Sequence, residues 1–124
     1  MAERWIYLPS ENVFREFPSR LFLALCAVER GYVVCIGKKQ SVGLMELHGP
    51  PGFVLDKGMA SWRLDQFKKR LSLGHRIGVS EEESLIIYQL PKNFLEQRSS
   101  PEILNTLDFY FTWGKEQSRL MQEA

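Results

Sequence analysis

Short apolar runs alternate with longer amphipathic or polar segments along the whole chain. The apolar runs are rich in β-branched and aromatic residues, which is typical of buried strands. The predicted strands cover residues 5–8, 32–36, 53–55, 75–79 and 109–112, and residues 85–88 form either a further short strand or the start of the next element. This alternation predicts a three-layer, doubly wound α/β domain of Rossmann-like type, with a mostly parallel sheet of about five strands.

The segments between these runs predict helices. Ser19 is a suitable N-cap for a helix over residues 20–30, and Gly31 is a suitable residue to end it. Nearly all of residues 21–28 are apolar, so we expect this helix to be buried on most sides, by the sheet and by something else.

Further helices are expected along the rest of the chain. Residues 41–47 form a short helix or turn, Ser61 caps a helix that ends at Gly74, and Ser100 precedes another. Residues 93–97 look helical, and residues 115–122 begin a last helix. The sequence stops inside that helix without a terminating signal, which suggests that more chain should follow.

Composition narrows the class of protein. The chain has 124 residues, of which 44% are hydrophobic and 25% charged, which suits one compact domain over residues 1–124. A net charge of +1 favours neither nucleic acid nor an anionic membrane. There is no signal peptide, and the longest apolar run, residues 21–28, is too short to form a transmembrane segment. We therefore expect a cytoplasmic protein in which Cys26 and Cys35 are reduced.

Several common catalytic motifs are missing. The sequence contains no G-x-G-x-x-G after the first strand, no Walker A motif and no G-x-S-x-G elbow. His48 and His75 lack the neighbouring ligands of a metal site, so no bound metal is expected. Candidate functional residues must therefore be identified from their positions at the ends of the predicted strands.

In an open parallel sheet, ligands bind beyond the carboxyl ends of the strands. Charged residues of both signs follow the predicted strands, and such a rim suits a hydroxylated, charged ligand. The candidates from this rule are Ser10, Glu11, Arg15, Glu16, Arg20, Lys38, Lys39, Asp56, Lys57, Ser80, the run 81–83 and residues 113–115. Each also fits a structural role, such as a surface salt bridge or a solvated turn.

Three parts of the sequence together resemble a known family. They are IYLPSENVFREFPSRLFLALCAVERGYVVCIGKK, FVLDKGMASWRLDQFKKRLSLGHRIGVSEEES and LDFYFTWGKEQSRLM, with the distinctive pieces REFPSR, DKG and WG. They look like the N-terminal part of the bacterial surface carbohydrate biosynthesis proteins. These proteins are glycosyltransferase-B-like and are linked to capsule and lipopolysaccharide assembly.

The resemblance implies an N-terminal lobe that receives the carbohydrate acceptor. The sugar nucleotide would bind a second lobe or partner chain, so this lobe would hold no cofactor and have little activity alone. Glu11 is then the first candidate for general base on the acceptor hydroxyl, and Glu16 the second. The substrate-binding candidates are Arg15, Arg20, Asp56 and Lys57.

Two alternatives from other classes stay open. A receiver-like phosphoacceptor domain has a similar length and an aspartate after the third strand, a position that Asp56 occupies here. However, Glu11 stands without the adjacent acid that would help to hold Mg²⁺, and Lys115 does not directly follow the last strand. A non-enzymatic α/β interaction module is the other alternative, because a fold alone does not fix a function.

Overall fold

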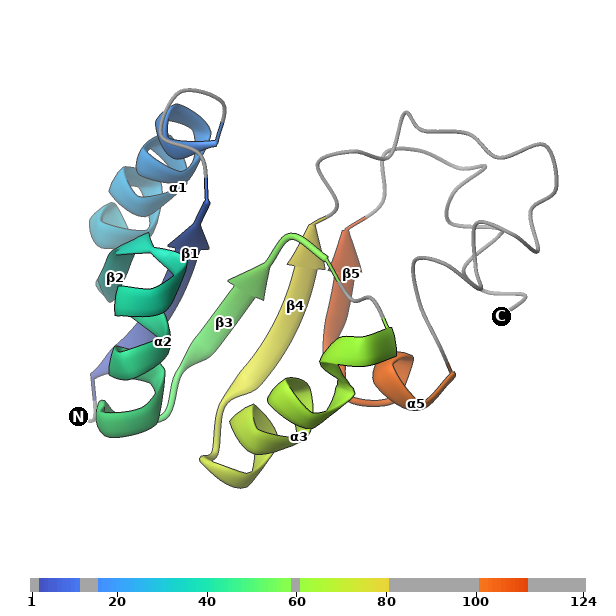
Figure 1. The fold of residues 1–124 in the computed structure, drawn as a ribbon. Helices are drawn as coiled ribbons and strands as arrows, with labels where there is room; N and C mark the ends of the chain where they lie inside the picture. The colour runs from blue at the N-terminus through green and yellow to red at the C-terminus, as the bar shows by residue number, and fades with distance from the viewer. Residues whose placement is uncertain (1–2, 12–15, 59–60, 81–100, 112–124) are drawn as a thin grey trace, which may run out of the picture.

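Five parallel strands form one sheet in the computed structural model, which describes residues 3–11, 16–58, 61–80 and 101–111. The order across the sheet is β2-β1-β3-β4-β5 (Figure 1). The strands are β1 (Arg4–Ser10), β2 (Tyr32–Lys38), β3 (Phe53–Asp56), β4 (Arg76–Ser80) and β5 (Phe109–Phe111). Each pairs in parallel with its neighbours, which confirms the predicted α/β fold.

Helices separate the strands along the chain and cover both faces of the sheet. They are α1 (Phe17–Glu29), α2 (Lys39–His48), the 3₁₀ turn η1 (Ser61–Arg63), α3 (Leu64–Ser72) and α5 (Pro101–Leu104). Consecutive residues of a strand point to opposite faces. Tyr7 packs with Val42 of α2, whereas Leu8 packs with Ala24 of α1. Helices α1 and α2 therefore lie on opposite faces of the sheet (Figure 1).

The apolar core has a layer on each face. On the α2 and α3 side, Phe67 of α3 meets Ile77 and Val79 of β4 and Ile103 of α5, and all four side chains are fully buried. A second cluster on this side surrounds Tyr7. The layer on the α1 side is centred on Leu8, Ala24 and Leu55.

The first helix starts earlier than predicted. It begins at Phe17 with Glu16 as its N-cap, so the predicted N-cap at Ser19 is wrong. Pro18 lies in the first turn, where its missing N–H costs no helical hydrogen bond. The Ser19 hydroxyl instead donates to the carbonyl of Glu16 inside that turn.

The other predicted boundaries are mostly within one or two residues. Gly31 and Gly74 both have φ of 88°, which confirms them as left-handed helix ends. The third helix begins at Leu64, after η1, with Arg63 as its N-cap in place of the predicted Ser61. The features predicted at residues 81–83, 85–88, 93–97, 112 and 113–122 lie outside the described residues.

The prediction that α1 is buried on most sides is wrong within the described part of the chain. Only the face with Arg20, Ala24 and Ala27 is buried, a spacing of four and then three residues that forms one stripe of the helix. Phe22 is 70% exposed, and Leu25 and Val28 are also exposed. The helix therefore packs against the sheet through two alanines and the buried Arg20, and turns large apolar side chains outward.

Replacement of Phe67 by Ala should lower the free energy of unfolding by about 3–5 kcal/mol, because it leaves a cavity in a fully buried cluster. The matched variant Phe22→Ala should cost less than about 0.5 kcal/mol, because Phe22 lies on the surface. Urea unfolding followed by circular dichroism measures both. A large loss for Phe22→Ala would show that the outer face of α1 is covered in solution.

Candidate functional site

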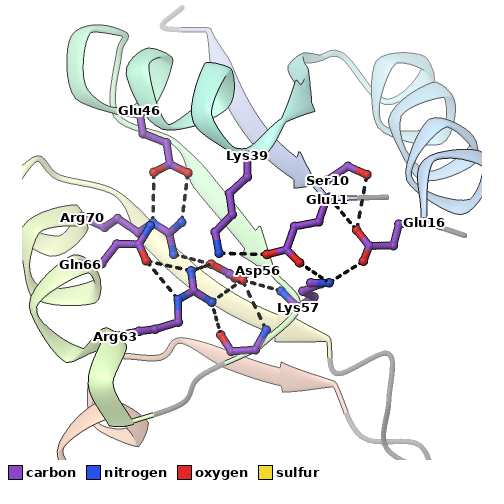
Figure 2. Close-up of polar contacts among 11 residues, drawn as sticks. Ser10, Glu11, Glu16, Lys39, Glu46, Asp56, Lys57, Arg63, Gln66 and Arg70 are labelled. Carbon is purple, nitrogen blue, oxygen red and sulfur yellow. Dashed lines mark hydrogen bonds and ion pairs between the residues drawn. The ribbon is translucent and has the colours of Figure 1, made fainter. Parts of the chain in front are cut away.

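Charged side chains gather at the carboxyl ends of three neighbouring strands. In the sheet β1 lies between β2 and β3, and Ser10 at the end of β1 is in register with Lys38 at the end of β2. The chain leaves β1 and β2 for helices on opposite faces, so the topological switch point of the sheet lies at this edge between β1 and β3. Figure 2 shows the resulting group of side chains between α1, α2 and α3.

Four of these side chains form what we call the Lys57 cluster: Glu11, Glu16, Lys39 and Lys57. The Nζ atom of Lys57 lies 2.5 Å from Oε1 of Glu16 and 2.9 Å from Oε2 of Glu11. The Nζ atom of Lys39 lies 3.0 Å from Oε1 of Glu11. The backbone N–H of Glu11 donates to Oε2 of Glu16 at 2.8 Å. Two carboxylates and two ammonium groups thus alternate along this edge.

The two glutamates of the Lys57 cluster differ in exposure. Glu16 is fully buried, whereas the side chain of Glu11 is 47% exposed. Hydrogen bonds from Lys57 and then from Lys39 hold the pKa of Glu11 below its ordinary value. Burial would lower the pKa of Lys57, but its hydrogen bonds to Glu16 and Glu11 raise it instead. Both groups therefore stay charged at neutral pH.

Asp56 is held by two arginines beside the Lys57 cluster. Arg63 forms a two-pronged ion pair with it, Nη1 to Oδ1 at 2.9 Å and Nη2 to Oδ2 at 2.6 Å. Nη1 of Arg70 also lies 2.7 Å from Oδ2. Burial would raise the pKa of Asp56, but the hydrogen bond from Arg63 and the charges of Arg70 and Arg63 hold it far below its ordinary value.

Arg70 also ties α3 to α2. Arg70 donates to both carboxylate oxygens of Glu46 on α2, at 3.1 and 3.3 Å, as well as to Asp56. Nε2 of His75 lies 2.6 Å from the backbone carbonyl of Glu46, and Nδ1 of His75 accepts the N–H of Gly52. These contacts require the ring to carry its proton on Nε2. We call the four buried charged groups Asp56, Glu46, Arg63 and Arg70 the Asp56 clamp.

The Asp56 clamp also shapes the loop that carries Lys57. Oδ1 of Asp56 accepts hydrogen bonds from the backbone N–H groups of Lys57 and Gly58, at 2.7 and 3.3 Å. Arg63 closes the loop from the other side by donating to the carbonyl of Gly58 at 2.9 Å. The direction of the Lys57 side chain toward Glu11 and Glu16 therefore depends on a buried aspartate one residue earlier (Figure 2).

An open hollow of about 480 Å³ lies beside the Lys57 cluster. Its lining is polar: Ser10, Glu11, Lys38, Lys39 and Gln40. A larger hollow, of about 790 Å³, lies between α1 and the opposite ends of the strands. Its lining includes apolar residues such as Leu23, Phe53 and Phe109 and the charged residues Glu3, Arg4, Arg30 and Arg76. Size alone favours the larger one. We assign the site to the smaller because it lies at the carboxyl ends of the strands, where open parallel sheets bind their ligands.

The six predicted site residues fall into different places. Glu11 reaches the hollow, and Lys57 contacts Glu11. Glu16 and Asp56 are buried behind them, and Asp56 is only 3% exposed. Arg20 is buried between α1 and β3, where its Nη1 donates to the carbonyl of Leu55 at 3.4 Å.

Arg15 lies outside the described residues. The catalytic and substrate-binding roles of all six residues stay predictions, but the geometry separates the exposed Glu11 from the buried groups that position its surroundings.

Sequence reasoning missed the partners of Asp56. Arg63, Phe67 and Arg70 share one face of the helical segment, at a spacing of four and then three residues. Phe67 marks that face as buried, so a charged residue on it signals an internal ion pair. Lys39 stood among the residues expected at the edge, yet its contact with Glu11 was not foreseen.

Neither the described residues nor the comparison with known proteins points to a metal site, a membrane-spanning helix or a protein family. Within residues 3–11, 16–58, 61–80 and 101–111, no cluster of three or more histidine, cysteine or acidic residues is arranged to hold a metal ion. In that same part of the chain no helix has the length and apolar character needed to cross a bilayer. Comparisons with protein-family models, curated proteins and solved structures found no match.

Replacement of Asp56 by Asn should lower the free energy of unfolding by about 3–5 kcal/mol at neutral pH, because it leaves two buried guanidinium groups without their carboxylate. The pKa of Asp56 is depressed in the folded state, so its stabilisation is complete above its unfolded pKa, roughly 3.9, and is lost as the pH falls below that. The difference between the native protein and the variant should shrink below about pH 4. Urea unfolding at several pH values measures it.

Asp65→Asn is the matched control for this experiment. Asp65 is exposed in the first turn of α3, so the same loss of charge there should cost less than about 1 kcal/mol. Equal losses for the two variants, or a difference that grows in acid, would contradict the role assigned to the Asp56 clamp.

Proposed function

We propose that this domain is the acceptor-side lobe of a glycosyltransferase-like protein of surface polysaccharide biosynthesis. The observation that carries the proposal is the polar hollow at the carboxyl ends of β1 and β2, with the half-exposed carboxylate of Glu11 at its edge. In a two-lobed enzyme this edge faces the cleft, and the second lobe would supply the activated sugar. The resemblance of the sequence to surface carbohydrate biosynthesis proteins supports the same assignment.

Glu11 is the better placed of the two candidate bases. A general base must come within hydrogen-bond reach of the proton that it removes. Glu11 is half exposed beside the hollow, whereas Glu16 is fully buried and engaged with Lys57 and the N–H of Glu11. In this proposal Glu16 positions Lys57 and the start of the loop after β1.

Glu11 must also change its surroundings to act as a base. Its pKa is lowered by hydrogen bonds from Lys57 and Lys39, which makes it a weak proton acceptor as it stands. Loss of either ammonium contact would raise that pKa toward the ordinary value of a glutamate. The proposal therefore requires that the bound acceptor, or the approach of the second lobe, draws at least one lysine away from Glu11.

A receiver-like phosphoacceptor domain is the second candidate, because the strand order β2-β1-β3-β4-β5 is common to that class. The surroundings of Asp56 argue against it. Both oxygens of this carboxylate accept hydrogen bonds from arginines, and the side chain is buried. A phosphoryl donor would have to displace that clamp before it could reach Asp56.

Incubation with acetyl phosphate and Mg²⁺ separates the two candidates. We expect no phosphorylation of Asp56, because its carboxylate is shielded from solvent. Intact-mass spectrometry, with the Asp56→Asn variant as the blank, measures the result. A gain of one phosphoryl group that disappears in the variant would favour the receiver and count against the transferase lobe.

A binding screen tests the acceptor-side assignment directly. Oligosaccharides should shift the backbone amide resonances of Ser10, Glu11 and Lys39 in ¹⁵N-labelled protein, because these residues line the hollow. Nucleotide sugars should shift the same resonances no more than inorganic pyrophosphate does, since the proposal assigns the sugar nucleotide to the other lobe. Larger shifts with nucleotide sugars than with pyrophosphate, or an absence of shifts with every oligosaccharide, would overturn the proposal.

A further inference from the structure

Two ammonium groups converge on the one exposed carboxylate of the Lys57 cluster. Lys39 begins α2 and Lys57 follows β3, so they come from separate elements, yet both reach Glu11 (Figure 2). Their Nζ atoms lie 3.0 and 2.9 Å from its two oxygens. Glu11 lies between them with almost half of its side chain in solvent and with the hollow beside it.

The described charges that line the hollow or belong to the Lys57 cluster do not cancel. Lys38, Lys39 and Lys57 carry three positive charges, and Glu11 and Glu16 carry two negative ones. Glu16 is buried and contacts Lys57 and the backbone N–H of Glu11, so among the described residues Glu11 is the carboxylate that faces the lysines on the solvent side of the Lys57 cluster. The surplus positive charge favours an anion, and exposed Glu11 holds a position that a ligand oxygen could take.

We propose that Lys39 and Lys57 form a binding site for the anionic group of a hydroxylated ligand, a carboxylate or a phosphate ester, which replaces Glu11 between them. This inference rests on the proposed function, because it names the chemistry of the acceptor. The ligand oxygens accept from the two ammonium groups. The displaced carboxylate of Glu11 stays within the same loop and accepts a hydrogen bond from a hydroxyl group of that ligand.

Replacement of Glu11 by the ligand would also draw the two lysines away from Glu11, as its proposed role as a general base requires. The hydrogen bonds that hold its pKa down come first from Lys57 and then from Lys39. A ligand that takes both lysines removes those bonds and makes Glu11 a stronger proton acceptor at the moment when a hydroxyl group is beside it. Ligand binding and activation of the base would thus be one event.

Isothermal titration with four probes tests the site: glucose, glucuronate, glucose 6-phosphate and inorganic phosphate. We expect glucuronate or glucose 6-phosphate to bind at least tenfold more tightly than glucose. Whichever of the two binds more tightly distinguishes a carboxylate ligand from a phosphate ester. Equal or weaker binding of both relative to glucose, together with no binding of inorganic phosphate, would overturn the proposal.

Variants locate the binding. Lys39→Gln should weaken the preferred anion about tenfold, because one charge-assisted contact is lost. Glu11→Gln should tighten it several-fold, because the competing carboxylate is gone. Lys68→Gln, an exposed position on α3, whose residues do not line the hollow, should change nothing. We avoid Lys57 as a test position because its loss would leave the buried carboxylate of Glu16 without this partner.

The outcomes separate this inference from the proposed function. Unchanged binding in Lys39→Gln would overturn the lysine site, and weaker binding in Glu11→Gln would overturn the replacement of Glu11. Lysine-dependent binding of inorganic phosphate without binding of any saccharide would uphold the anion site while the glycosyltransferase assignment fails.

Discussion

A carboxylate that is removed from water must be matched by positive charge, and much of this domain is arranged around that constraint at Asp56. The Asp56 clamp contains two acids and two arginines, so its formal charge sums to zero within the fold. Each arginine forms several hydrogen bonds, which is the condition under which burial of an ion pair is tolerated. The clamp fixes α2, α3 and the end of β3 relative to one another.

The candidate site depends on the Asp56 clamp because Lys57 directly follows Asp56 in the chain. Asp56 is internal and Lys57 faces the edge, so one loop joins a rigid buried network to a solvent-facing one. The starts of two helices complete the edge with opposite charges, Glu16 before α1 and Lys39 at the start of α2. The topology brings them together because the crossovers from β1 and β2 run to opposite faces of the sheet.

The sheet could be predicted from the sequence because its strands are short, apolar and separated by clear helix ends such as Gly31 and Gly74. The edge residues could be named for the same reason, since topology alone places the residues that come directly after each strand. Which of them are buried could not be foreseen. Glu16 looks like a loop residue in the sequence, whereas in the structure it is buried in contact with Lys57 and the backbone N–H of Glu11. The burial of α1 was overestimated because hydrophobicity does not reveal which neighbour a side chain meets.

The outward face of α1 has a consequence for how the domain behaves in solution. On the face of the sheet opposite α2 and α3, helix α1 exposes the apolar side chains of Phe22, Leu25 and Val28 to water. Surfaces of this kind adhere to one another and to hydrophobic supports. Retention on a hydrophobic column, aggregation at high salt and sensitivity to mild detergent would therefore depend on this helix and on other exposed apolar side chains such as Trp62 and Leu44, and the charged edge of the sheet would have little part in them.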